Sequence, residues 1–188
     1  MKKITVILSG VGIYGYSGLA LMEFFHRNQI KPNLIVGCSQ GALMAALWAK
    51  GYSPQESLEY IRGFHHAAQN ARIDISILFC FFRRMFMKYD KNHAMLKVGN
   101  IKKMYQELFL TQRIEHLPVE TIFQATNAED GETHYIREGL LSDAVYASSA
   151  ILPFSRCLNA IGLPTLLVSS DFVITIFVWL LLLMLSAL

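Results

Sequence analysis

The sequence predicts a three-layer α/β domain in which helices cover both faces of a mainly parallel sheet. Residues 3–8, Lys-Ile-Thr-Val-Ile-Leu, are β-branched and apolar enough for a buried parallel strand, and a helical pattern follows over residues 19–28. Residues 34–36 form a second short apolar strand, which helix-forming residues 42–50 follow. Strands that alternate with helices indicate a parallel sheet, and 188 residues are enough for a single α/β core.

The second strand runs directly into a Gly-x-Ser-x-Gly turn made of Gly37, Cys38, Ser39, Gln40 and Gly41. Between a strand and a helix this motif predicts a nucleophile elbow, a tight reversal that lifts the Ser39 hydroxyl clear of the sheet edge. Glycines two residues either side allow neighbouring backbone to approach without a Cβ clash. The helix starts at the hydroxyl, so its free N–H groups face any anion formed there.

A glycine-rich loop, residues 9–15, joins the first strand to the first helix. Converging backbone N–H groups in such a loop suit either a phosphate or the oxyanion of an acyl-transfer intermediate. The Gly-x-Gly-x-x-Gly spacing also occurs in dinucleotide-binding folds, but there an acidic residue is expected near the end of the next strand, where this chain has the serine elbow. A purely structural loop is a further interpretation, and the loop residues whose N–H groups could hold an oxyanion are Gly10, Val11, Gly12 and Gly15.

The remaining elements follow from local signals. Gly51 closes the elbow helix, and the capping box Ser53 to Glu56 opens another that runs to about residue 64. An amphipathic helix is expected over residues 97–110, and strands over 121–126 and 133–136 with Asp130 in the turn between them. Residues 77–87 interleave large apolar side chains with two arginines, and both a core-packing helix and a lipid-facing mouth remain open.

Together these motifs resemble the patatin-like phospholipases, serine acyl hydrolases that work with a Ser-Asp dyad. The resemblance covers about residues 1–154, because residues 124–131 and 142–153 are similar to the family's late strand, turn and Ala-Ser-x-Ala-x-Pro helix. It implies a lipid acyl hydrolase with Ser39 as nucleophile, a lipid or phospholipid substrate, contact with a membrane surface, and no metal or organic cofactor. Val11 and Tyr14 depart from the family's oxyanion loop. No Asp-Gly-Gly or Asp-Gly-Ala follows Pro153, where the family keeps its catalytic aspartate.

The sequence therefore does not identify the general base that would act with Ser39. Five of the six histidines are expected at surface positions, and His26 lies on the first helix, before the nucleophile. A dyad with one carboxylate is therefore more consistent with the chain than a triad. Asp143 falls where a helix should start. Asp171 follows an apolar stretch at about the family's position, but Phe172 and Val173 replace the expected glycines. The alternative is a catalytically impaired, truncated or membrane-tethered relative that lacks the dyad aspartate.

Composition gives no sign of disorder or of a nucleic-acid-binding surface, with 53% apolar residues and a net charge of +3. Three widely spaced cysteines, without a Cys-x-x-Cys pair, fit a reducing compartment and predict no disulfide framework or zinc site. The apolar stretch 4–8 is too short for the core of a signal peptide. We expect a cytoplasmic or membrane-associated protein, and the sequence does not predict its oligomeric state.

The charge distribution divides the chain into a catalytic-type domain, residues 1–156, and an apolar tail, residues 157–188. All 17 Lys and Arg residues lie at or before Arg156, and the only charged side chain after it is Asp171. The run from residue 172 to the C-terminus is 17 residues long, whereas a spanning helix needs about 20. Three interpretations remain open: a membrane anchor, a buried strand and helix that complete the core, and an altered reading frame.

Overall fold

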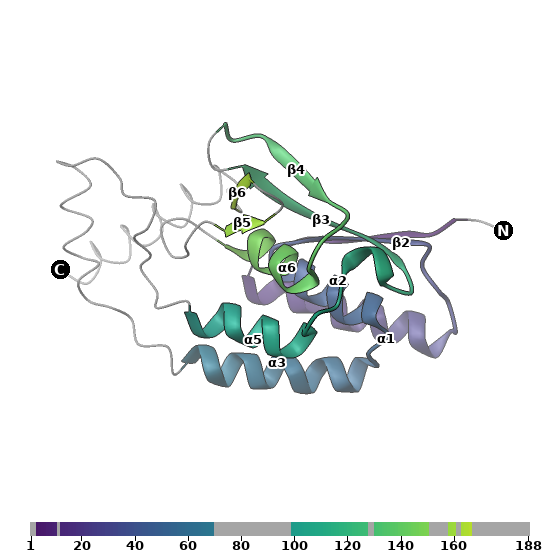
Figure 1. Cartoon of the computed structure of the whole chain (residues 1–188). Helices are drawn as coiled ribbons and strands as arrows, with labels where there is room; N and C mark the ends of the chain where they lie inside the picture. Colours follow the sequence, from purple (N-terminus) through teal and green to yellow (C-terminus); the bar gives the residue numbers. More distant parts are fainter. Residues whose placement is uncertain are drawn as a thin grey trace, which may run out of the picture.

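The computed structural model describes residues 3–10, 12–69, 99–127, 130–150, 158–160 and 163–166 (Figure 1). The first part of the chain forms β1 (Thr5–Leu8), the short 3-10 helix η1 (Gly12–Ser17), α1 (Gly18–Arg27), β2 (Leu34–Cys38), α2 (Gln40–Lys50) and α3 (Pro54–Gln69). The later part forms α5 (Gly99–Phe109), the 3-10 helix η2 (Ile114–His116), β3 (Glu120–Asn127), β4 (Thr133–Ile136), α6 (Leu141–Ser149), β5 (Leu158–Ala160) and β6 (Leu163–Leu166).

The described strands form one sheet in the order β1-β2-β3-β6-β5, with β4 paired to β3 outside this path. The central strands β1, β2 and β3 are parallel, in a register that places Leu8 beside Gly37 and Gly37 beside Phe123. Strands β4 and β6 run antiparallel to β3, and β5 runs antiparallel to β6. The predicted α/β class with a mainly parallel sheet is confirmed.

The described helices pack on one face of this sheet (Figure 1). In β1, Val6 and Leu8 are buried against them, whereas Ile7 projects from the opposite face and is 73% exposed. The prediction of a fully buried first strand is therefore wrong for the described part of the molecule, because β1 is covered on one side alone. Helices that would cover the second face, as a three-layer arrangement requires, are not among the described residues.

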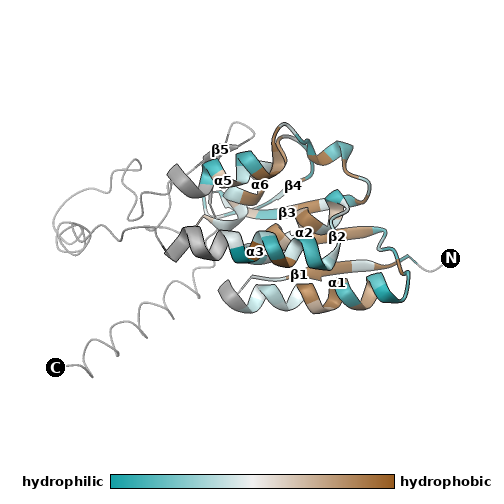
Figure 2. Ribbon diagram, turned by 90° about the horizontal axis from the view of Figure 1, so that it is seen from below, coloured by the Kyte–Doolittle hydropathy of each residue, from teal (hydrophilic) through white to brown (hydrophobic). Residues whose placement is uncertain are grey.

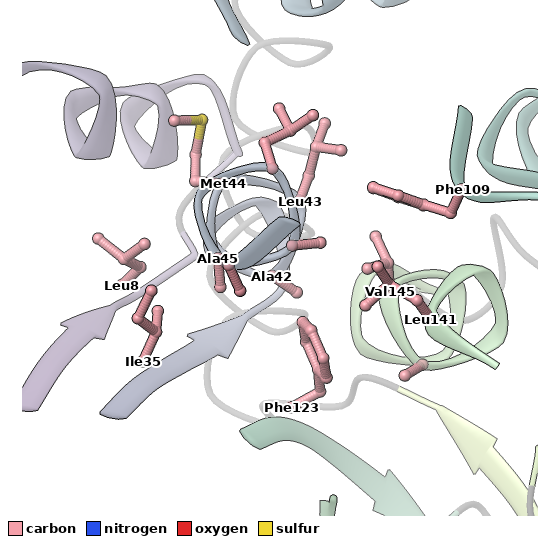
Figure 3. Packing of buried hydrophobic residues seen from close by; sticks show 14 of the residues in the cluster. Leu8, Ile35, Ala42, Leu43, Met44, Ala45, Phe109, Phe123, Leu141 and Val145 are labelled. Carbon is pink, nitrogen blue, oxygen red and sulfur yellow. The ribbon is translucent and has the colours of Figure 1, made fainter. Parts of the chain in front are cut away.

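The core lies between the sheet and α2. Eight of the eleven residues of α2 are buried, and four of those eight are alanines, so the helix sits close to the strands on one side and to other helices on the remaining sides. Figure 3 shows strand residues Leu8, Ile35 and Phe123 pointing toward α2, with Phe109, Leu141 and Val145 packing from α5 and α6. Hydrophobic residues dominate β1, while the outer helix α3 mixes polar and apolar residues (Figure 2).

The helix ends follow the predicted signals. Gly51 ends α2 with a left-handed φ of 94°, a conformation that glycine adopts without strain. The capping box opens α3: the Ser53 backbone N–H donates to Glu56 Oε2 at 2.8 Å, and the Glu56 N–H donates to Ser53 Oγ at 3.2 Å. Helix α3 runs five residues beyond the predicted end, to Gln69. Asp130 is a turn residue, as predicted, because it accepts hydrogen bonds from the Asn127 side chain and the Glu132 backbone.

Several predictions fall on parts of the chain outside the described residues. They concern residues 77–87, the side chains of Cys80, Cys157 and Asp171, and the apolar run from residue 172 onward. Within the described ranges no helix is long and apolar enough to cross a membrane. The division at residue 156 stays a prediction, and strands β5 and β6 lie beyond that position and join the sheet.

Candidate active site

Two turns meet at the carboxyl edge of the parallel strands. The glycine-rich loop follows β1, which ends at Leu8, and the serine elbow follows the neighbouring strand β2, which ends at Cys38. In open α/β sheets ligands bind outside the carboxyl ends of the strands, so this edge is where a site is expected.

Ser39 occupies a strained position between β2 and α2. Its φ of 55° and ψ of −125° lie in a sparsely populated region for a residue with a Cβ, which costs on the order of 1–3 kcal/mol. The Ser39 carbonyl accepts the first hydrogen bond of α2, from the Ala42 N–H at 2.9 Å. The chain thus reverses within one residue from strand to helix, which is the backbone form that a nucleophile elbow requires.

Ser39 is buried, with 8% of the surface of the whole residue accessible. The sequence predicts a Ser39 hydroxyl that stands clear of the sheet edge, whereas in the structure the loop after β1 lies against Ser39. A Cβ built on Gly10 would lie 2.6 Å from Ser39 Cβ and 3.1 Å from Ser39 Oγ. Glycine at position 10 therefore allows the loop after β1 to lie directly against the serine.

The other loop and elbow glycines also mark close approach. A Cβ on Gly15 would lie 2.8 Å from Gln40 Cβ, and one on Gly37 would lie 2.7 Å from the Cα of Ala42. A Cβ on Gly41 would overlap the carbonyl of Leu8. The start of α2 therefore lies in close contact with the end of β1 and with the glycine loop. A larger residue at any of these glycines would force the segments apart.

The predicted oxyanion residues Gly10, Gly12 and Gly15 lie in this loop, and Val11 is outside the described residues. Gly12 is the first residue of η1, whose leading N–H groups have no acceptor within the helix. Gly10 and Gly15 contact the elbow at Ser39 and Gln40, respectively. The loop therefore surrounds the start of α2, where both the backbone N–H groups and the positive end of the helix dipole favour a negative charge.

Two side chains beside Ser39 add polar groups to the site. Burial raises the pKa of the Cys38 thiol, so Cys38 stays protonated at neutral pH and is a poor nucleophile. The Gln40 Nε2 atom is buried and has no hydrogen-bond acceptor among the described residues. An unpaired buried donor is costly, and an acceptor atom on a ligand would satisfy it.

Sequence reasoning missed one residue of this site, Ser148 on α6. Its hydroxyl accepts a hydrogen bond from the Ser39 backbone N–H at 2.9 Å and donates one to the Gln124 carbonyl at 2.6 Å. Its signal in the sequence was its place in the Ala-Ser-x-Ala part of residues 142–153, which assigned it no role.

Among the described residues no carboxylate or imidazole is hydrogen bonded to Ser39. Asp143 stands in the first turn of α6, as its predicted helix-start role requires, and lies 3.7 Å from the Lys102 ammonium. Of the histidines, His26 and His116 are exposed and His134 lies on β4. Asp171, the candidate base, is outside the described residues.

An open cavity of about 320 Å³ lies elsewhere, between α2, α3 and α5, and does not include Ser39. Its lining includes Leu43, Tyr60 and Glu107. Since the carboxyl edge of the sheet carries the strained serine and the glycine loop, we take that edge and not this cavity as the candidate site. The described residues contain no group of three or more His, Cys, Asp or Glu side chains that could hold a metal ion.

The family model described as Patatin-like phospholipase matches residues 6–164 of this chain. The matched range includes the glycine loop, the elbow and the helix that carries Ser148.

Proposed function

Since the chain belongs to the patatin-like phospholipase family, we propose that it is a lipid acyl hydrolase with Ser39 as its nucleophile. The observation that carries the proposal is the elbow. Ser39 stands in a strained backbone conformation at the start of α2, with the glycine loop packed against its side chain at Gly10. Backbone strain of this kind clusters at functional sites, where the surrounding structure maintains it.

In the proposed reaction Ser39 Oγ attacks the ester carbonyl and its proton passes to a general base. Backbone N–H groups of Gly10, Val11, Gly12 and Gly15, and that of Gln40 at the start of α2, are the candidates for holding the oxyanion. The base returns the proton to the leaving alcohol as the ester bond breaks. Water then attacks the acyl-enzyme, which releases the fatty acid and restores Ser39.

The proposed substrates are lipid or phospholipid esters taken from a membrane surface, and the scheme requires no cofactor. The proposed location is the cytoplasm, free or associated with a membrane. Asp171 is the late aspartate nearest to the family's position, but Phe172 and Val173 replace the glycines that would let its loop approach Ser39. The scheme therefore needs a carboxylate that orients the hydroxyl and accepts its proton, and it does not assign that role to Asp171.

A second candidate function is a binding protein that keeps the elbow but has lost catalysis. It is favoured by one observation: within the described ranges Ser39 has no hydrogen-bonded carboxylate or imidazole. Without a base, the hydroxyl at neutral pH is a weak nucleophile.

The two candidates are separated by hydrolysis assays on the full chain. The assays follow p-nitrophenyl butyrate hydrolysis and fatty-acid release from phosphatidylcholine vesicles, together with covalent labelling by a fluorophosphonate. Ser39→Ala is expected to lower turnover by at least about a thousandfold and to abolish labelling, with folding intact. The control is Ser57→Ala, which removes another buried serine, on α3, whose hydroxyl contacts the Met22 sulfur.

Turnover that survives in Ser39→Ala would remove Ser39 from the mechanism. A folded wild-type chain with neither turnover nor labelling would support the binding protein.

A further inference from the structure

Ser148 connects the nucleophile to the sheet through two hydrogen bonds. Its side chain is fully buried, and its hydroxyl accepts from the Ser39 N–H at 2.9 Å while donating to the Gln124 carbonyl at 2.6 Å. The bond to Ser39 is buried and the bond to Gln124 is partly buried, so a missing partner would leave a polar group poorly satisfied.

The position of this link in the sheet gives it a specific role. Cys38 and Gln124 form the last pair between β2 and β3, and the chain of β2 turns away from the sheet at Ser39. The Ser148 hydroxyl joins the two strands just past that last pair. It accepts from the Ser39 N–H, which lies past the end of β2, and donates to the Gln124 carbonyl, at the point where β2 stops pairing with β3.

We propose that Ser148 is a positioning residue that holds the Ser39 peptide in its strained conformation. This proposal rests on the proposed function to the extent that Ser39 is the nucleophile. Because the Ser39 N–H is engaged by Ser148, it does not face an oxyanion, and that task falls to the N–H of Gln40 and to those of the glycine loop. Through Ser148, helix α6 thereby helps to orient the Ser39 hydroxyl.

The neighbouring Ser149 provides a matched control on the same helix. Its hydroxyl donates to the carbonyls of Val145 and Tyr146 within α6 and is hydrogen bonded to the Tyr105 side chain of α5, and none of these partners belongs to the elbow. Ser149→Ala therefore removes a hydroxyl from α6 without touching Ser39. Any effect of Ser148→Ala that Ser149→Ala shares reflects the stability of the helix and not the position of the nucleophile.

The first measurement is independent of catalysis. Amide hydrogen exchange at Ser39, followed by ¹H–¹⁵N spectra of the full chain, is expected to speed up about tenfold or more in Ser148→Ala. It is expected to stay at the wild-type rate in Ser149→Ala. An unchanged Ser39 exchange rate in a folded Ser148→Ala protein overturns the proposal.

The second measurement uses ester hydrolysis and fluorophosphonate labelling. Ser148→Ala is expected to lower kcat and the labelling rate about tenfold or more, with KM within about twofold, because the substrate still binds while the nucleophile is misplaced. Ser148→Thr, which keeps the hydroxyl, is expected to restore part of the loss. Wild-type kcat and labelling rate in Ser148→Ala would also overturn the proposal.

If Ser148→Ala fails to fold, Ser148→Cys replaces it, since the thiol has a similar size and makes only weak hydrogen bonds. The same losses are expected in that variant, and wild-type rates would count against the proposal. Failure of the proposed function has a different signature: the wild-type chain neither hydrolyses esters nor reacts with the fluorophosphonate, while Ser39 amide exchange still responds to Ser148→Ala.

Discussion

Gly10→Ala tests whether the loop after β1 positions the nucleophile. The added Cβ would lie 2.6 Å from Ser39 Cβ, whereas two carbon atoms in contact are about 3.5–4.0 Å apart. The loop and the elbow must therefore separate by about 1 Å, and a misplacement of that size costs about a hundredfold in rate. We expect kcat/KM for a short-chain ester to fall by about that factor. We also expect the free energy of unfolding to fall by roughly 1–3 kcal/mol, the usual cost of overpacking.

The assay compares kcat/KM and urea unfolding for the wild type, Gly10→Ala and the control Gly63→Ala. Gly63 lies on α3, and a Cβ there meets nothing within 4 Å. Gly63→Ala is expected to leave the rate unchanged and to raise the unfolding free energy by about 0.5–1 kcal/mol, because alanine favours a helix over glycine. A Gly10→Ala protein with wild-type stability and a rate within about threefold of wild type would refute the reasoning, since the loop would then have room to spare.

Two further predictions concern a carboxylate outside the site and the apolar tail. Hydrogen bonds from its own backbone N–H and from the Arg113 side chain lower the pKa of Glu115 from 4.5 to about 2, so its stabilising effect is complete above pH 4.5 and is lost as the pH falls toward 2. Urea unfolding between pH 5 and 2 should therefore depend less steeply on pH in Glu115→Gln, and identical slopes would contradict this. The full-length chain is expected to sediment with phospholipid vesicles or to aggregate, and Asp171→Asn to change ester hydrolysis by no more than about twofold. A soluble monomer whose hydrolysis collapses in Asp171→Asn would instead make Asp171 the base.

The local elements of this fold were predictable because each has a strong local cause. The Gly-x-Ser-x-Gly turn between an apolar strand and a helix, and the Ser53–Glu56 capping box, determine backbone shape within a few residues. The structure places strand ends and helix starts at these positions. The sequence therefore located the candidate nucleophile, and the family match over residues 6–164 agrees with the resemblance on which the function rests.

What sequence reasoning missed depends on contacts between distant residues. The hydrogen bond between Ser148 and Ser39 joins positions 109 apart in the chain, and no periodicity or turn rule signals it. The burial of Ser39 likewise depends on how closely Gly10 approaches, which follows from strand pairing and not from the loop sequence alone. The general base cannot be located from the sequence for the same reason, because the two residues of a dyad must be close in space and need no fixed spacing along the chain.

The one-sided packing of the sheet has a topological consequence. Strands β1, β2 and β3 follow one another across the sheet in a single direction, and right-handed crossovers in a single direction place every connecting helix on the same face. The face that exposes Ile7 can be covered by a right-handed crossover only if the strand order reverses. The chain must then add a parallel strand on the other side of β1. A strand at that edge, whether from this chain or another, would mark the point of reversal beside the glycine loop.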